Sequence, residues 1–202
     1  MAIPREPDRI IPFTDAIVAI AVTLLVLPLV DVVPETARKG EGATEVITGN
    51  RPEIYAFLLS FAVIMRLWFR HHQIFRHVRA YSRPLIMCNV GWLLAIIVLP
   101  FPTEMVGVYG SDRFTVGFYI GTILLANVFQ TGMDAVIRAD PEVASEDRPM
   151  THEFLTGSAA ATAMLAVAMI LALLVPTLNY WALLVLFLAP AAERAWLRHR
   201  RS

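Results

Sequence analysis

The sequence predicts an all-α polytopic membrane protein with six transmembrane helices per subunit and both termini in the cytoplasm. Hydrophobic residues make up 57% of the 202 residues and the mean hydropathy is +0.60, whereas soluble domains are about 45 to 50% apolar. Long apolar stretches recur along the chain, and basic residues are distributed unequally between the segments that join them. No internal repeat is visible, so residues 1–202 are expected to form one six-helix transmembrane domain.

Six stretches approach the ~20 mostly apolar residues that a spanning helix needs. They cover roughly residues 10–32, 53–75, 84–106, 114–137, 154–175 and 178–197. Pro100 and Pro102 interrupt the third stretch and Pro190 the sixth. Because proline removes a backbone hydrogen bond, we expect both helices to kink or end early. The polar segments 33–52 and 138–153 are expected to be exposed loops.

The basic residues predict the orientation of the helices. With the N-terminus inside the cell, 13 of the 17 basic residues lie on or near the cytoplasmic face, which is the side that arginine and lysine favour. The outer face then carries Arg38, Lys39, Arg51 and Arg113. Six spans return the C-terminus to the cytoplasm, so we expect an integral, multi-pass protein of the cell membrane.

The composition argues against several classes of function. The 17 basic and 17 acidic residues balance, which gives no indication of a nucleic-acid partner. The single cysteine, Cys88, cannot form an internal disulfide. The adjacent His71 and His72 raise the question of a metal or haem, but neighbouring helical side chains diverge by about 100° and few further ligands exist. We expect no metal, no other cofactor and no enzyme activity.

The first apolar stretch carries an acidic residue, Asp15, just inside its predicted cytoplasmic end. An acidic side chain costs about 2.5 to 3.5 kcal/mol at the middle of a membrane helix and less near its end, so its presence suggests a specific role. The apolar run also exceeds the roughly 7 to 15 residues of a signal-peptide core. We therefore expect this stretch to be a retained span.

Polar residues from three predicted helices lie at the same depth. Asp15 is at the cytoplasmic end of the first helix, His71 and His72 are at that of the second, and Asn89 is near the cytoplasmic start of the third. Trp68 shares the helix face of the histidines, which points toward the bundle. We expect these side chains to meet, with Asp15 paired to a histidine or to the asparagine.

The first helix has two distinct sides. At about 100° per residue, a sector of about 60° holds an apolar stripe, and Asp15 points about 150° away from its centre. The sector comprises Arg9, Phe13, Ile20, Leu24, Leu27 and Asp31. Either the stripe faces an axis and Asp15 faces neighbouring protein, or Asp15 faces a pathway and the stripe is ordinary packing. Thr23, about 60° from the stripe, either serves that pathway or bonds its hydroxyl back to its own helix.

These residues resemble the signature of the prokaryotic relatives of transmembrane protein 175, an endosomal and lysosomal potassium channel. That family opens its first helix with Arg-x-x-x-Phe-Ser-Asp, followed by Ala-Ile-Ala-x-Thr-Leu-Leu-Val-Leu. Here the first motif reads Arg9, Phe13, Thr14 and Asp15, and the second runs over residues 19–27. The similarity continues at Trp68-Phe69-Arg70-His71-His72, Asn89 and Leu99-Pro100-Phe101. It covers the first three helices, whereas the last three correspond only in number and hydrophobicity.

The resemblance implies a potassium-permeable cation channel, with four subunits around one pore that the first helix lines. Ile20, Leu24 and Leu27 would form a hydrophobic gate, and Thr23 would contribute to selectivity. A cytoplasmic-side network that holds the helix would comprise Arg9, Phe13, Thr14, Asp15, Trp68, His71 and Asn89. The implied partners are further copies of this chain in a homotetramer, the lipid bilayer and monovalent cations, with K+ as the permeant ion and no cofactor.

Physical arguments agree with this picture. One six-helix bundle offers few polar groups for an internal water path, so an aqueous route is expected at a symmetric interface between subunits. A ring of isoleucines or leucines closes such a route by excluding water. Asp31, at the outer end of the stripe, is either a solvated acid or part of an acidic ring that concentrates cations in an outer vestibule.

The chain departs from the family pattern at two positions. Thr14 replaces the usual serine and keeps the hydroxyl, with an extra methyl group to accommodate. Pro28 follows the stripe by one residue and is expected to bend the outer end of the first helix.

Two other functions remain as alternatives. A proton-coupled secondary transporter would use Asp15 and His71 as a proton relay, although no inverted repeat is visible and no span before the third is broken at mid-membrane by glycine or proline. A membrane enzyme or haem protein would need ligands or catalytic groups that the sequence does not provide.

Overall fold

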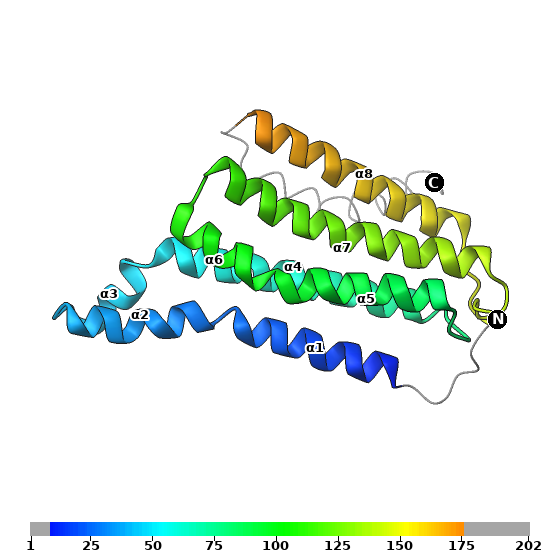
Figure 1. Ribbon diagram of the computed structural model, residues 1–202, viewed down its shortest axis with the longest axis horizontal. Coiled ribbons are helices and arrows are strands. Elements are labelled where there is room, and N and C mark those ends of the chain that lie inside the picture. Colours follow the sequence, from blue (N-terminus) through cyan, green and yellow to red (C-terminus); the bar gives the residue numbers. More distant parts are fainter. Residues whose placement is uncertain (1–8, 176–202) are drawn as a thin grey trace, which may run out of the picture.

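The structure, a computed structural model, describes residues 9–175, which form eight α-helices (Figure 1). Their bounds are α1 Ile10–Leu24, α2 Leu27–Arg38, α3 Ala43–Thr48, α4 Arg51–Phe75, α5 Arg83–Val98, α6 Pro100–Tyr109, α7 Arg113–Ala139 and α8 His152–Leu174. Within the described residues, five helical segments are long and apolar enough to cross a membrane, with α1–α2 and α5–α6 each counted as one. The predicted all-α fold and the first five spans are confirmed, whereas the sixth predicted span, 178–197 with Pro190, lies outside the described residues.

The first span is interrupted between Leu24 and Leu27. Pro28 has no N–H to donate to the carbonyl of Leu24, and α1 ends at Leu24. The backbone then tightens, because the Leu25 N–H donates to the Val22 carbonyl over 3.3 Å and Val26 N–H to the Thr23 carbonyl over 3.4 Å. The bend expected at Pro28 is therefore present, and α2 continues beyond it.

The polar segment 33–52 is largely helical, so its interpretation as a loop was wrong for most of its residues. Helix α2 continues to Arg38 and α3 follows, and Figure 1 shows both at one end of the bundle. Pairs four residues apart stabilise the helix beyond Pro34: Glu35 and Lys39 form an ion pair at 3.0 Å, and Thr36 Oγ1 donates to the Val32 carbonyl over 3.0 Å. Such polar pairs leave no hydrophobic periodicity in the sequence, so the hydropathy pattern does not reveal this helix.

The third span is divided at the predicted proline. Helix α5 ends at Val98, Leu99 forms the junction, and α6 begins with Pro100. Proline suits the first turn of a helix, where its missing N–H has no intrahelical partner in any case. The two helices together run from Arg83 to Tyr109 as one candidate span.

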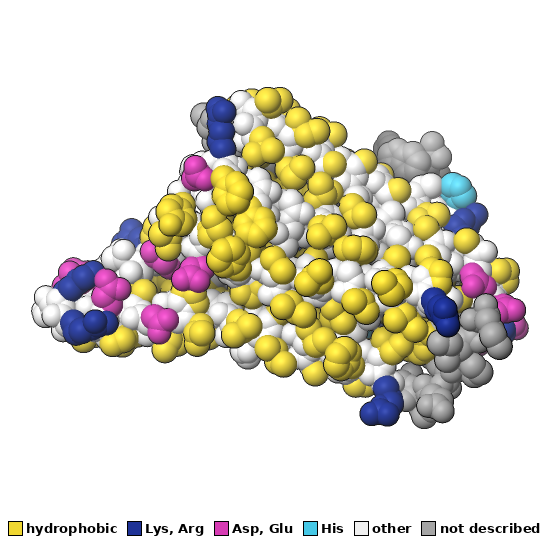
Figure 2. All heavy atoms as spheres, in the orientation of Figure 1, with side chains coloured by type: hydrophobic (Ala, Val, Ile, Leu, Met, Phe, Trp, Pro, Cys, Tyr) yellow, Lys and Arg dark blue, Asp and Glu magenta, His cyan; other side chains and the backbone are white. Residues whose placement is uncertain are grey.

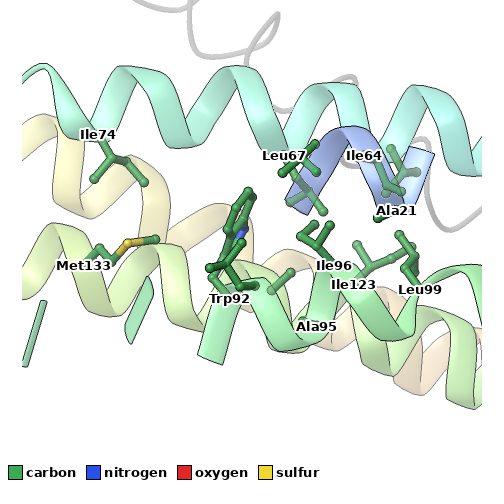
Figure 3. Close-up of a cluster of buried hydrophobic side chains, with 14 of the residues drawn as sticks. Ala21, Ile64, Leu67, Ile74, Trp92, Ala95, Ile96, Leu99, Ile123 and Met133 are labelled. Carbon is green, nitrogen blue, oxygen red and sulfur yellow. The ribbon is translucent and has the colours of Figure 1, made fainter. Parts of the chain in front are cut away.

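The helices pack as layers, with α1 at one edge of the bundle and α8 at the other (Figure 1). Helix α1 packs against α4, α5 and α6, and α7 packs against α4, α5, α6 and α8. The core between them is apolar: Figure 3 shows Ile64, Ile96 and Ile123 from α4, α5 and α7 gathered near Ala21 of α1, and all four are almost completely buried. This core holds α1 by one side only.

The α4–α5 and α7–α8 loops are fastened to each other. The Ser145 N–H donates to the His77 carbonyl over 2.8 Å, and Arg79 N–H donates to the Val143 carbonyl over 2.7 Å. The Arg79 side chain also pairs with Glu146. Segment 138–153 is therefore a fixed connection, and its Val143 is fully buried rather than exposed.

The surface of the molecule is divided by polarity. In Figure 2 hydrophobic side chains cover the middle of the visible face, and charged side chains gather toward its two ends. This distribution is what a bilayer requires, because charged groups are stable only where headgroups and water can solvate them.

Candidate functional site

The first span, which comprises α1 and continues into the start of α2, has one buried face and one exposed face. Thr14, Val18, Ala21 and Leu25 recur at helical spacing and are all nearly inaccessible. The stripe residues lie on the other side: Ile20 is 60% exposed, Leu24 43% and Leu27 53%. The exposed face is thus a continuous apolar surface that the described part of this chain leaves uncovered.

The stripe continues to both ends of the first span. Phe13 is 62% exposed, and Arg9, which directly precedes α1, is exposed as well. At the outer end Asp31 of α2 is also exposed. The residues of the predicted sector therefore form one exposed surface on the bundle, which is charged at its two ends and apolar between them.

Asp15 faces α4 rather than the stripe. Its Oδ1 accepts a hydrogen bond from Trp68 Nε1 over 2.8 Å, and the same oxygen lies 3.5 Å from His72 Nε2. The Trp68 and His72 rings are themselves in contact, with centroids 4.4 Å apart. Of the two orientations that the sequence left open, the structure has Asp15 against neighbouring protein and the stripe free.

A second group of hydrogen bonds joins α1, α5 and α4. Asn89 Nδ2 donates to Thr14 Oγ1 over 3.2 Å, and Asn89 Oδ1 accepts from His71 Nε2 over 2.8 Å. The His71 ring is stacked between Phe75 and Trp92, each with centroids 4.4 Å away. Because the amide, hydroxyl and imidazole are all buried, each needs the partner that the other helix supplies.

The structure brings together five of the seven residues that were assigned to the network. Thr14, Asn89 and His71 form one group, and Asp15 with Trp68 forms the other, which His72 joins. Arg9 and Phe13 are not part of either group within the described residues. Both project from the exposed side of α1, in line with the stripe, as their helical angles require.

Thr23 bonds to its own helix. Its Oγ1 donates to the Ile20 carbonyl over 2.7 Å, and the side chain is exposed beside the stripe. The hydroxyl hydrogen is thereby directed toward the helix backbone, and the lone pairs of the oxygen point away from the helix. Thr23 can present an acceptor at the surface, which is the group that a dehydrating cation seeks.

The two adjacent histidines contact different partners. His71 bonds to Asn89 while His72 approaches Asp15, and their ring centroids lie 6.1 Å apart. Within residues 9–175 no group of three histidine, cysteine or acidic side chains is arranged to hold a metal ion. His199 belongs to the residues that the structure does not describe.

A buried ion pair between α4 and α7 was missed by the sequence analysis. Arg70 donates to Asp134 Oδ2 over 2.8 Å, and the Asp134 side chain is completely buried. Gln130, one helical turn away, donates to the Leu67 carbonyl over 2.7 Å. Asp134, like Asp15, is an acid within an apolar span. This feature of the sequence is sufficient to mark it as a residue of interest.

Comparisons with known proteins agree with this geometry. The family model for the endosomal/lysosomal potassium channel TMEM175 matches residues 9–100, which contain α1 to α5 and all the network residues. The crystal structure of a lysosomal potassium-selective channel TMEM175 homolog from Chamaesiphon minutus superposes with a TM-score of 0.73 at 26% identity, covering 92% of this chain and 96% of that one. This chain is similar to the TMEM175 family in residues 9–100 and in its overall fold.

Similar proteins in this family differ in length and in name. A potassium channel of Streptomyces collinus is 34% identical over 105 residues, covering 52% of this chain and 50% of the relative. A potassium channel of Chamaesiphon minutus is 34% identical over 128 residues, covering 61% and 63%. The human endosomal/lysosomal proton channel TMEM175 is 30% identical over 141 residues, covering 64% and 28%. The chain thus matches less than two thirds of the length of each of these three relatives.

The five candidate spans and the similarity to the TMEM175 family identify this chain as a multi-pass membrane protein. The hydrophobic side chains across the face shown in Figure 2 are what such a protein requires. The family is one of ion channels and not of enzymes.

Proposed function

We propose that this protein is a potassium-permeable cation channel in which four copies surround a central pore lined by α1. Relatives that are 34% identical to it are named potassium channels, and the similar crystal structure is of a potassium-selective channel. The proposal places six spans in each subunit, with both termini in the cytoplasm and the lipid bilayer around the assembly. A closed ring of identical subunits is the usual way to surround a pore with one helix type.

The exposed apolar face of α1 is the observation that carries this proposal. The core holds α1 by the face of Thr14, Val18, Ala21 and Leu25, while its opposite face is uncovered along the depth of the membrane. Four such faces turned inward would line a continuous path, since α1 and α2 together are long enough to cross the bilayer. The anchoring contacts of Asp15 on the other side leave the stripe free to do so.

In this pore Ile20, Leu24 and Leu27 form the constriction. Each would contribute a ring of four branched apolar side chains, and such rings exclude water unless the pore dilates or the helices rotate. Thr23 would place four hydroxyl oxygens beside the constriction, with lone pairs available to a partly dehydrated cation. Asp31 would form an acidic ring in the outer vestibule that raises the local concentration of cations.

The cytoplasmic-side contacts hold this helix at a defined rotation. Two hydrogen-bonded groups fasten α1 to α4 and α5, one at Thr14 in the buried face and one at Asp15 beside it. Because rotating α1 would break them, they define which residues face the axis. We assign the network a structural role in gating rather than a place in the ion path.

Flux measurement on reconstituted protein tests the proposal directly. Purified protein in liposomes should release K+ down its gradient, and chemical cross-linking in the same membranes should give a four-subunit product. Flux that is absent in correctly folded, reconstituted protein would contradict the channel, and a dimeric or trimeric product would contradict the tetramer.

Proton permeation is the second candidate, because the similar human relative is named a proton channel. The proton-coupled transporter that was considered from the sequence would need a relay between Asp15 and His71. The structure instead has Asp15 next to His72, and His71 bonded to Asn89. Flux that saturates with K+ concentration and requires a pH gradient would favour the transporter, whereas proton flux without K+ coupling would indicate a proton-permeable pore.

A further inference from the structure

The exposed face of α1 and α2 has opposite charges at its two ends. Arg9 directly precedes α1, Asp31 lies in α2, and both are exposed. Twenty-two residues separate them in the sequence, which is about 33 Å at about 1.5 Å per residue, close to the ~30 Å thickness of the hydrocarbon core. The two charges therefore lie near opposite faces of the membrane.

Arg9 belongs to the stripe and not to the anchoring network. It is separated from Ile20 by eleven residues, which at about 100° per residue brings the two side chains to within about 20° of each other around the helix. The hydrogen-bonded groups of Asp15 and Thr14 leave it out. Within the part of the chain that the structure describes, its guanidinium forms neither an ion pair nor a side-chain hydrogen bond.

We infer, on the basis of the function proposed above, that four Arg9 side chains form a positive ring at the cytoplasmic mouth of the pore and make potassium conduction rectify. A positive ring lowers the concentration of cations at the inner mouth, whereas acids at Asp31 raise it at the outer mouth. Cations then enter more readily from outside than from the cytoplasm. The channel consequently passes inward current more easily than outward current when K+ is equal on both sides.

The four-subunit arrangement is what gives this charge its effect. A single exposed arginine is screened by salt beyond about 8 Å at physiological ionic strength, but four around one narrow opening act together on every ion that passes. Guanidinium stays charged throughout the accessible pH range, so the ring is a permanent feature. Its influence on the current should depend on salt and not on pH.

Inside-out membrane patches containing the full-length protein provide the test, because they fix which side of the channel is cytoplasmic. In symmetric 0.1 M KCl we expect inward current to exceed outward current at equal and opposite voltages. Arg9→Gln should increase the outward current about threefold, the change in local cation concentration that a potential near kT produces. Arg9→Glu should increase it further, and Arg9→Lys should leave the rectification as in the parent protein.

Arg138→Gln is the matched control, since Arg138 is exposed in the last turn of α7 on the same side of the membrane, whereas α1 packs against α4, α5 and α6. It should leave the current–voltage curve unchanged, and 1 M KCl should abolish the difference between Arg9→Gln and the parent because the screening length falls to about 3 Å. A conducting Arg9→Gln channel with an unaltered curve would overturn the role of Arg9 while leaving the channel intact. Absence of current in every variant and in the parent would instead overturn the proposed function, and with it this inference.

Discussion

Trp68 Nε1 donates to Asp15 Oδ1 over 2.8 Å, and this bond joins the C-terminal half of α4 to the first turns of α1. It lies on the side of α1 opposite the exposed stripe. The carboxylate of Asp15 therefore attaches α1 to α4. The apolar stripe on the other side of the helix is left exposed. Apolar exposure is normal at a lipid-facing surface, so what the contacts of Asp15 decide is that the stripe points away from this subunit's core.

The Trp68–Asp15 bond should contribute measurably to stability. Asp15→Asn and Trp68→Phe should each lower the free energy of unfolding by about 1 kcal/mol, because a hydrogen bond to a charged group is stronger than average but Asp15 is 38% exposed. The double variant should be less destabilised than the sum of the two, since Trp68→Phe removes the donor and Asp15→Asn removes the charge of the acceptor in the same bond. Thermal unfolding in detergent measures this. Strict additivity would show that the two side chains do not interact.

Polar substitution in the stripe should open the pore to water. Ile20→Asn should raise basal K+ flux about tenfold, which corresponds to lowering the barrier by roughly 1.4 kcal/mol. Met164→Asn on α8 is the control, because Met164 is 48% exposed on a helix that packs on α7, at the opposite edge of the bundle from α1. If both variants raise flux equally, the effect comes from general loosening and the gate does not lie at Ile20.

The buried pair of Arg70 and Asp134 should tolerate joint removal better than removal of one partner. Asp134→Leu alone should cost about 3 to 5 kcal/mol, because it leaves a guanidinium that is largely buried without its carboxylate. Arg70→Met with Asp134→Leu should recover most of that loss, since an apolar pair replaces two desolvated charges. Unfolding of the purified variants measures the difference. A double variant as unstable as the sum of the singles would mean that the pair is not the dominant interaction of either residue.

Close packing of α5 on α7 depends on a glycine. A Cβ at Gly91 would lie 2.4 Å from ring atoms of Phe129, so Gly91→Ala should destabilise the protein by about 1 to 3 kcal/mol. Phe129→Leu should partly restore stability in the Gly91→Ala background by moving the obstructing atoms. Gly121→Ala is the matched control, because the nearest atom to its Cβ is Met169 Sδ at 3.9 Å. Equal losses at the two glycines would contradict the packing explanation.

The sequence alone determined the number and order of the first five spans, because a bilayer imposes a strict length of apolar residues on each. It also determined the break at Pro100, the bend near Pro28 and the two opposite sides of α1, since proline chemistry and the 3.6-residue period act locally. The expectation that Asp15, the histidines and Asn89 meet at one depth followed from topology, and the contacts of the structure agree with it.

Only the tertiary structure decided which side chains pair at that depth. The sequence could not distinguish His71 from His72, because adjacent residues share a depth and differ only in direction, and the structure has His72 at Asp15 and His71 at Asn89. It likewise decided that Arg9 and Phe13 accompany the stripe on the exposed side of α1. Local rules fix the period of a helix, whereas the rotation of that helix against its neighbours is fixed by packing and by buried polar groups that must find partners.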